Sequence, residues 1–181
     1  MPHLEQIDNR WRRAKKECIA VIETPKGRRN KLSYDEELDA FRLDFILPKG
    51  MTFPYDFGFI PRTLAPDGDA LDVLVLMEEP ADVGCVVPVR IVGIVEAEQR
   101  EGSKRFRNDR VLAVSVHSFQ HSGIKKAGDI DQTILNQLEE FFVSYNKARG
   151  RGFRVKGVHG PNRAADAIDA THLTYKKKHK S

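Results

Sequence analysis

Cysteines and long apolar segments are scarce in this sequence. Cys18 and Cys85 are the two cysteines among 181 residues, and no Cys-x-x-Cys motif is present, so neither a disulfide framework nor a cysteine-ligated zinc site is indicated. No apolar run approaches the ~20 residues that a membrane-spanning helix needs. The first residues, Met-Pro-His-Leu-Glu-Gln-Ile-Asp, lack the charged-then-apolar pattern of a signal peptide. We therefore expect a cytoplasmic protein that does not enter a membrane.

A strong excess of one charge is also lacking. The net charge is +4, but the tail at residues 176–181 holds four lysines, so the remaining chain is formally neutral (4 − 4 = 0). A second basic cluster occupies residues 10–16. Basic chain ends can bind nucleic acid or acidic partners, but they are more often solvated helix ends or termini. We therefore do not expect a nucleic-acid partner.

The length and composition are those of one globular domain. Hydrophobic residues make up 40% and charged residues 31% of the chain, which is typical of folded proteins and not of disordered ones. A chain of this length can bury a sizeable core. We expect residues 1–181 to form a single domain, with an arm or helix at residues 1–16 and a basic tail at residues 176–181.

Most of the chain has the pattern of short strands separated by turns. The charged stretch at residues 98–108 predicts a hairpin loop or an excursion over a site. Several short strands without intervening helices are typical of a small barrel and not of βαβ units. β-branched or alternating apolar residues predict strands at residues 18–24, 31–34, 41–45, 86–96 and 111–116.

Two helices are predicted near the C-terminal end. Asp129 and Gln132 have the spacing of a capping box, and Gly150 is a stop signal. Between them apolar residues recur at helical spacing, namely Ile130, Ile134, Leu138, Phe141, Phe142 and Tyr145. Gly160-Pro161 predicts the start of a last helix, with one stripe formed by Ala165, Ile168, His172 and Tyr175.

Three aspartates occupy the middle of the chain, in Asp67-Gly68-Asp69-Ala70-Leu71-Asp72. Asp67 and Asp69 project from the same side of an extended chain, and Gly68 permits a tight turn between them. Asp72 lies at the mouth of a predicted buried strand. Carboxylates this close repel one another unless a cation lies among them, and oxygen ligands suit Mg²⁺ or Mn²⁺ better than Zn²⁺. The segment therefore indicates a site for a hard divalent cation.

Two other interpretations apply to this segment. Asp-Gly-Asp is also a common surface turn, and on the segment alone this alternative stays open. A calcium loop of the EF-hand type also begins Asp-x-Asp, and Glu78 falls at its twelfth position. Leu71 at the fifth position, Asp72 in place of the glycine at the sixth, and the lack of predicted flanking helices exclude that loop.

The aspartate segment resembles the signature of soluble family I inorganic pyrophosphatases, Asp-x-Asp-Pro-x-Asp followed by an aliphatic residue. Ala70 stands where that family usually has proline. The preceding Phe-Pro-x-x-x-Gly-x-Ile-Pro at residues 53–61 is similar to the family as well. The resemblance extends from about Ile19 to the last helix. It implies an α+β, mainly β fold, a closed five-stranded OB-like β-barrel with helices packed outside.

The resemblance also implies an activity and its central residues. It implies a Mg²⁺-dependent inorganic diphosphatase with several metal ions per site (Mn²⁺ being possible), which hydrolyses pyrophosphate to two phosphates with a metal-activated water. Relatives of this length further imply a homo-oligomer. Glu23 matches an active-site glutamate and Lys31 a phosphate-binding lysine. The signature aspartates match metal ligands, with the middle one as general base: Asp67, Asp69 and Asp72.

Other substrate contacts are implied at positions that depart from the family pattern. Arg110 stands where the family has a lysine; arginine also binds phosphate, with a different reach and geometry. Tyr145 matches a phosphate-contacting tyrosine, although its helical spacing alone would place it in the core. The family has a lysine directly after this tyrosine. This chain has Asn146 there, followed by Lys147, which we assign to the substrate.

A second pair of metal ligands is implied at the end of the long strand and at the start of the next. At the first place the chain offers Glu96, Glu98 and Gln99, and at the second Asn108 and Asp109. We select Glu98 and Asp109. Asp109 is shifted by one residue, which turns a strand side chain to the opposite face unless a bulge restores it.

Four further positions lack a group that many family members have. They are Ser33 for an acidic residue, Phe45 for a phosphate-binding arginine, and Phe53 and Phe57 for tyrosines. Each lost contact costs about 1.5–3 kcal/mol of transition-state binding if nothing replaces it. We therefore expect compensation, with Tyr55, Arg42, Lys49 and Arg62 as nearby candidates.

The departures keep two other functions open. One is a catalytically impaired barrel that binds a phosphate compound or, through its basic ends, nucleic acid. The other is hydrolysis of a larger diphosphate such as a nucleotide.

Overall fold

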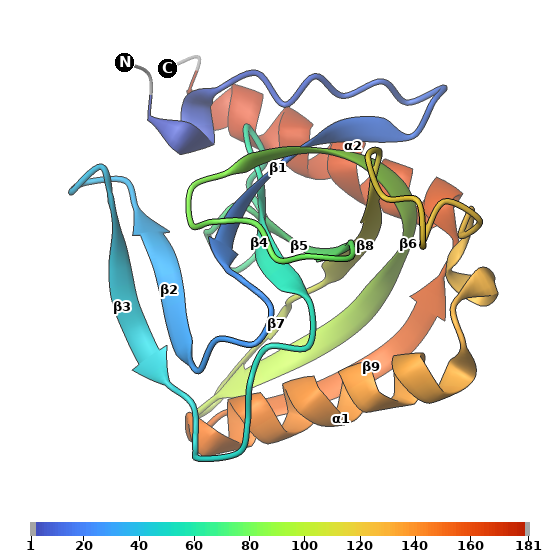
Figure 1. The fold of residues 1–181 in the computed structure, drawn as a ribbon. Coiled ribbons are helices and arrows are strands. Elements are labelled where there is room, and N and C mark those ends of the chain that lie inside the picture. Colours follow the sequence, from blue (N-terminus) through green and yellow to red (C-terminus); the bar gives the residue numbers. More distant parts are fainter. Residues whose placement is uncertain (1–2, 180–181) are drawn as a thin grey trace.

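The computed structural model describes residues 3–179 and shows an α+β fold that is mainly β (Figure 1). The ends of the predicted arm and of the predicted basic tail, residues 1–2 and 180–181, lie outside the described residues. Two of the elements, η1 and η2, are short 3₁₀ turns. The elements in chain order are η1 (Leu4–Gln6), β1 (Glu17–Thr24), β2 (Asn30–Asp35), β3 (Ala40–Ile46), β4 (Asp56–Ile60), β5 (Leu71–Leu76), β6 (Val86–Glu101), β7 (Lys104–Arg107), β8 (Arg110–Ser115), η2 (Ala127–Asp129), α1 (Gln132–Ala148), β9 (Gly152–His159) and α2 (Pro161–Lys178).

Five of the strands pair in a cycle. β1 pairs with β4, β4 with β5, β5 with β8, β8 with β6, and β6 also pairs with β1. The β5–β8 pair is parallel and the other pairs of the cycle are antiparallel. β7 and β9 pair with β6, while β2 and β3 form a separate hairpin beside the cycle (Figure 1). The predicted class, α+β and mainly β, is confirmed.

Strand alternation divides the core between two hydrophobic clusters. In β5, Leu74 and Leu76 pack in one cluster with Phe142 of α1, whereas Val73 and Val75 pack in the other, which includes residues of α2. This division follows from the period of two in a strand, because successive side chains point to opposite faces. The central strands are buried on both faces, so their sequences are continuously apolar.

The predicted strands and hairpin overlap β1, β2, β3, β5, β6, β8 and the β6–β7 hairpin. At the N-terminus, where an arm or a helix is predicted, η1 is a turn of three residues and the rest of the segment is an arm. Three features differ from prediction. β4 lies in the proline-containing segment at residues 53–61, where no strand is predicted. β9 lies where no strand is predicted, because it is half exposed and only Phe153 is buried. α1 is capped by Asp131 and not by Asp129, since the Asp131 side chain accepts a hydrogen bond from Thr133 N at 2.7 Å.

The last helix begins as predicted and extends into the basic tail. Pro161 is at its start and residues 176–178 form its last turn, where lysines interact favourably with the C-terminal end of the helix dipole. In the part of the chain that the structure describes, no helix is both long and apolar enough to cross a membrane.

Candidate active site

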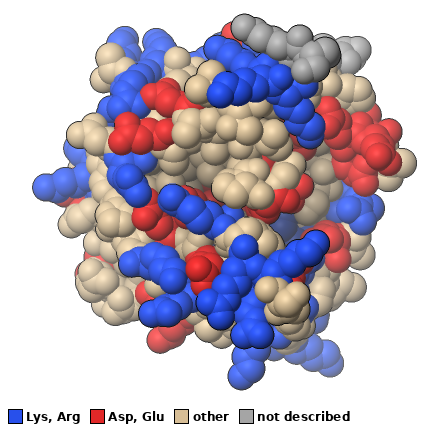
Figure 2. All heavy atoms as spheres, turned by 180° about the vertical axis from the view of Figure 1, so that it is seen from behind, with Lys and Arg blue, Asp and Glu red and all other residues tan. Residues whose placement is uncertain are grey.

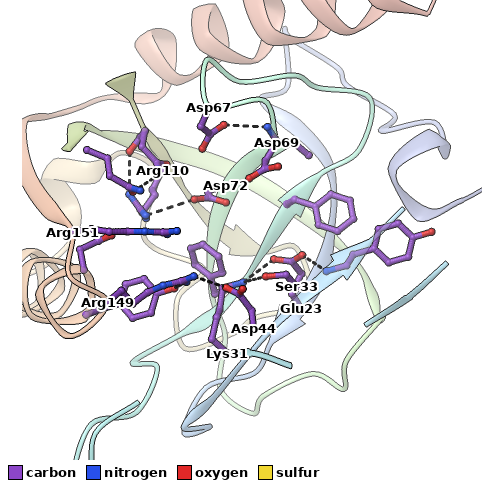
Figure 3. A pocket seen from close by; sticks show the side chains of 18 of the residues that line it. Glu23, Lys31, Ser33, Asp44, Asp67, Asp69, Asp72, Arg110, Arg149 and Arg151 are labelled. Carbon is purple, nitrogen blue, oxygen red and sulfur yellow. Dashed lines mark hydrogen bonds and ion pairs between the residues drawn. The ribbon is translucent and has the colours of Figure 1, made fainter. Parts of the chain in front are cut away.

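A cavity of about 270 Å³ collects charged side chains from segments distant in sequence (Figure 3). In Figure 3 Asp67 and Asp69 lie at the upper side of the cavity and Arg149 and Lys31 at the lower side. This arrangement surrounds a small space with groups of both signs. The acidic lining residues are Glu5, Glu23, Asp44, Asp67, Asp69 and Asp72, and the basic ones are Lys31, Arg42, Arg110, Arg149 and Arg151.

The three signature aspartates lie on and just after the turn that leads into β5. Gly68 has a φ of +96°, a left-handed conformation that glycine adopts without steric cost. Asp67 Oδ1 accepts a hydrogen bond from Asp69 N at 3.2 Å, and Asp72 is the second residue of β5. The turn thus brings all three carboxylates to one cavity.

Parallel pairing of β5 and β8 sets Asp72 beside Arg110. The two residues are register partners, and Arg110 Nη2 lies 3.7 Å from Asp72 Oδ2. The guanidinium carbon is 4.3 and 4.5 Å from the ring centroids of Phe142 and Phe153, contacts that stabilise a cation. Nη1 donates to Asn108 O at 3.0 Å, and the buried Nε has no hydrogen-bond partner in the described chain. Arg110 is therefore a fixed cation suited to a phosphoryl oxygen.

Burial raises the pKa of four carboxyl groups in the cavity, those of Glu5, Asp67, Asp69 and Asp72. The pKa of Asp72 rises to about 7 and that of Asp67 to about 6, mainly because burial disfavours the charged form, while Arg110 lowers both values. The N-terminal arm adds Glu5, whose pKa burial and neighbouring carboxylates raise to about 7. Arg110 alone does not offset the burial of these groups, so the cavity favours a further cation.

A β-bulge in β1 turns Glu23 toward the cavity. The pairing of β1 with β4 shifts between Ile22 and Thr24, so Glu23 is the extra residue. Its Oε2 lies 3.2 Å from Lys31 Nζ, and its Oε1 accepts a hydrogen bond from Tyr34 N at 2.7 Å. The Glu23 and Lys31 side chains are only 10% and 7% exposed. Glu23 thus holds the Lys31 ammonium in place at the cavity wall.

On β6 and just before β8, amides line the cavity where carboxylates are predicted. Gln99 and Asn108 are lining residues, and Asn108 Nδ2 donates to Gln99 Oε1 at 2.7 Å. Glu98 and Asp109 do not line the cavity, and Asp109 Oδ1 instead accepts a hydrogen bond from Ala97 N at 3.1 Å. The structure therefore does not bring Glu98 and Asp109 to the cavity, and their role as metal ligands stays a prediction. For Glu98 on β6 the reason is the period of two, because a shift of one residue turns a strand side chain to the opposite face. Asp109 lies between β7 and β8, where its carboxylate accepts hydrogen bonds from Ala97 N and Arg107.

The end of α1 contributes residues that the sequence analysis does not identify. Tyr145 lines the cavity, whereas Lys147 is exposed and lies outside it, so the structure does not bring the predicted Lys147 to the site. Arg149 and Arg151 line the cavity instead. They flank Gly150, the predicted helix stop. A pair of arginines around this stop, close to the matched tyrosine, is the sequence signal for them.

Two of the four positions that depart from the family pattern, Ser33 and Phe57, contact Lys31. Lys31 Nζ donates to Ser33 Oγ at 3.1 Å and lies 4.9 Å from the ring centroid of Phe57. Of the four candidates for compensation, Arg42 lines the cavity. The others, Tyr55, Lys49 and Arg62, do not.

Known proteins share this sequence pattern and fold. A sequence model described as inorganic pyrophosphatase matches residues 20–176. The chain belongs to the inorganic pyrophosphatase family. The inorganic pyrophosphatase of Thermus thermophilus is 36% identical over 159 residues, which cover 86% of this chain and 89% of that protein. That of a Nostoc species is 33% identical over 156 residues, covering 86% and 90%. The crystal structure of an inorganic pyrophosphatase from Thermus thermophilus matches with a TM-score of 0.88 at 32% identity, over 97% of this chain and 99% of that one.

The resemblance to soluble pyrophosphatases implies bound metal ions, and the cavity fits them in donor chemistry. Its acidic residues offer only oxygen ligands, which hard divalent cations prefer. Asp67 and Asp69 form no ion pair with any residue that the structure describes. Within residues 3–179, no three Asp, Glu, His or Cys side chains converge into a ready-made metal site. The carboxylates thus share the cavity without meeting at one point, and a cation would lower their mutual repulsion.

Without metal, the protein is expected to lose stability as the pH rises from 5 to 8. The pKa values of Asp67, Asp72 and Glu5 lie above the ordinary 3.8 and 4.5. The folded chain therefore binds more protons than the unfolded chain between about pH 4 and 7, and stability falls across that window. Carboxyl groups with a lowered pKa, such as Asp39, titrate below this pH window and do not counteract the fall. We expect the Tm in EDTA to be at least about 3 °C lower at pH 8 than at pH 5, the shift that ~1 kcal/mol produces in a chain of this size.

Calorimetry at both pH values, with and without Mg²⁺, measures this effect. Mg²⁺ should raise the Tm more at pH 8, where the carboxylates are charged. Asp67→Asn should weaken the pH dependence. A metal-free Tm that is higher at pH 8 than at pH 5 contradicts the prediction.

Proposed function

We propose that the chain is a Mg²⁺-dependent inorganic diphosphatase that hydrolyses pyrophosphate to two phosphates. The observation that carries the proposal is the placement of Asp67, Asp69 and Asp72 in one cavity with Lys31 and Arg110. Membership of the inorganic pyrophosphatase family supports the same activity.

Pyrophosphate hydrolysis needs clustered groups of both signs. The substrate is a polyanion that repels an incoming hydroxide, and the leaving phosphate gains charge as the P–O bond breaks. When bound, divalent cations lower the pKa of a coordinated water to about 7 and neutralise phosphoryl oxygens. Asp67, Asp69 and Asp72 are the residues that would hold them.

Asp69 has a second role in this proposal, and the remaining cavity residues bind the substrate. We assign Asp69 as the general base that takes a proton from the attacking water, because its side chain is exposed at the cavity. Lys31, oriented by Glu23, and Arg110 bind phosphoryl oxygens. The Tyr145 hydroxyl accepts a hydrogen bond from Arg149, which leaves its own proton available for a phosphate oxygen. Three predicted residues, Glu98, Asp109 and Lys147, are left out of this site because they do not line the cavity.

Purified protein is expected to release phosphate from pyrophosphate in the presence of Mg²⁺. EDTA should abolish the release, because the carboxylates then have no cation to hold near the substrate. A colorimetric phosphate assay with a buffer blank measures both results, and ATP in place of pyrophosphate tests the larger diphosphate. No release above the blank contradicts the proposal. Faster phosphate release from ATP than from pyrophosphate would show that a nucleotide, and not pyrophosphate, is the preferred substrate.

A binding module without catalysis is the less favoured alternative. On the face shown in Figure 2, basic side chains are interspersed with acidic ones and do not form one continuous patch, which does not suit a nucleic-acid backbone. Nucleic-acid affinity that persists after deletion of residues 176–181, together with no hydrolysis, would favour the module.

The proposal includes four further expectations. They are a cytoplasmic location, a homo-oligomeric assembly, Mn²⁺ as a substitute metal, and an OB-like barrel formed by the cycle of five strands.

A further inference from the structure

One end of the cavity lacks two cations that the resemblance leads one to expect. Position 45 holds phenylalanine in place of an arginine, and position 146 holds asparagine in place of a lysine. The Asn146 amide does not replace that lysine, because Nδ2 donates to Phe142 O in the preceding helical turn at 2.9 Å. A phosphate group at this end of the site therefore needs a cation from another part of the chain.

Arg149 supplies a guanidinium at this end. Its Cζ lies 5.4 Å from the ring centroid of Phe45 and 5.5 Å from that of Tyr145. Its Nη1 donates to the Tyr145 hydroxyl, and its Nη2 lies 2.8 Å from Asp44 Oδ2. The side chain is 13% exposed and lines the cavity, on the same side as the labelled Asp44 in Figure 3. The guanidinium is thus next to Phe45, one of the two positions that lost a cation, and next to Tyr145, which directly precedes the other.

The end of α1 explains how a residue outside the motif reaches this place. α1 ends at Ala148, Arg149 is its C-cap, and Gly150 has a φ of +72°, a turn that glycine makes without strain. The turn leads the chain into β9. Arg149 is therefore held between a helix and a strand, and Asp44 fixes its side chain.

The contacts of Arg149 leave room for a ligand. A guanidinium has five N–H donors, and the two bonds above occupy one donor on each terminal nitrogen. The Asp44 side chain is 24% exposed, so water screens part of its charge. An arginine fixed in this way binds a phosphate group with little loss of side-chain entropy.

We propose that Arg149 binds a phosphate group of the substrate in place of the two missing cations, and that Asp44 positions it. The substrate class is a diphosphate, so this inference rests on the proposed function. It assigns the contact to Arg149 rather than to Lys147, the residue that the sequence pattern favours.

The first test compares Arg149→Met with the wild type. Methionine keeps much of the side-chain length but removes the charge. We expect the Kd of inorganic phosphate, measured by calorimetry in Mg²⁺, and the KM for pyrophosphate to rise about 10- to 100-fold, the effect of losing a charge-assisted hydrogen bond. Arg154→Met is the matched control, because Arg154 is exposed and outside the cavity. A phosphate Kd within twofold of wild type overturns the inference.

A second variant tests whether Arg149 takes over the function of position 45. Phe45→Arg, added to Arg149→Met, places a guanidinium on β3 close to the lost one. The double variant should bind phosphate at least about tenfold more tightly than Arg149→Met does, since the side chains at positions 45 and 149 adjoin. A double variant that binds phosphate as weakly as Arg149→Met contradicts the replacement.

A measurement on the wild-type protein tests the inference without any variant, so it stays informative if a variant fails to fold. A dicarbonyl reagent that modifies arginine is applied with and without inorganic phosphate, and each arginine is followed by mass spectrometry. Phosphate should slow modification of Arg149 and leave Arg154 unchanged. Equal rates at Arg149 with and without phosphate overturn the inference.

The two proposals fail in different ways. If the wild type binds phosphate but does not hydrolyse pyrophosphate, the proposed function fails, and the binding and protection data still decide the role of Arg149. If the wild type hydrolyses pyrophosphate and Arg149→Met keeps its KM and phosphate Kd, only the inference about Arg149 fails.

Discussion

Replacing Asp69 by asparagine is expected to lower kcat for pyrophosphate by about a thousandfold, within the roughly 10²–10⁴-fold range for removal of a general base. Asparagine keeps the shape of the side chain and an oxygen acceptor, but it cannot take a proton from water. Asp69 is exposed at the cavity, so the substitution should leave the fold intact. Steady-state phosphate release at saturating Mg²⁺ measures the loss, and circular dichroism confirms folding.

The matched control for this prediction is Asp82→Asn. Asp82 is exposed and does not line the cavity, so its kcat should stay within about twofold of wild type, as for most surface substitutions. If Asp69→Asn kept more than a tenth of the wild-type kcat, Asp69 would not be the base. Asp67→Asn and Asp72→Asn would then be the variants to compare.

Replacing Arg110 by methionine is expected to lower the stability of the metal-free protein by about 3 kcal/mol at pH 8. Removing one partner of a buried ion pair typically costs about 3–5 kcal/mol, because the remaining charge is left without its partner. The lower figure applies here because Asp72 is 22% exposed. The cation–π contacts with Phe142 and Phe153 are lost as well. Urea denaturation measures the change as a lower midpoint at an unchanged slope.

Asp72 provides the control for the Arg110 prediction. In the double variant Arg110→Met with Asp72→Asn, no carboxylate remains to be stabilised, so part of the lost stability should return. The single variant should also lose less stability at pH 5 than at pH 8, because Asp72 has a pKa of about 7 and is protonated at the lower value. A double variant less stable than Arg110→Met would show that Asp72 and Arg110 do not act as a pair.

The sequence identifies the carboxylate and lysine parts of the site because these depend on short-range geometry. Asp67, Asp69 and Asp72 need only one glycine turn to reach the same cavity. Glu23 and Lys31 come from consecutive strands, β1 and β2. The role of these residues in catalysis stays a prediction, but their common location follows from neighbouring positions in the chain.

The positions of Glu98 and Asp109 show which feature of the site the sequence alone does not determine. A strand presents alternate residues to each face, so the residue type at a motif position is informative only when the register is known. Pairing among β6, β7, β8 and β9 sets that register. It brings Gln99 and Asn108 to the cavity.

The sequence by itself determined the mainly β class, the family resemblance and the cluster of three aspartates, because periodicity and local motifs are properties of neighbouring residues. The tertiary structure alone decided how Arg110 meets Asp72 and that Arg149 joins the cavity. Arg110 reaches Asp72 through parallel pairing of β5 and β8, and Arg149 reaches the cavity through the turn between α1 and β9. Such contacts join segments distant along the chain, and the packing of helices and strands brings them together.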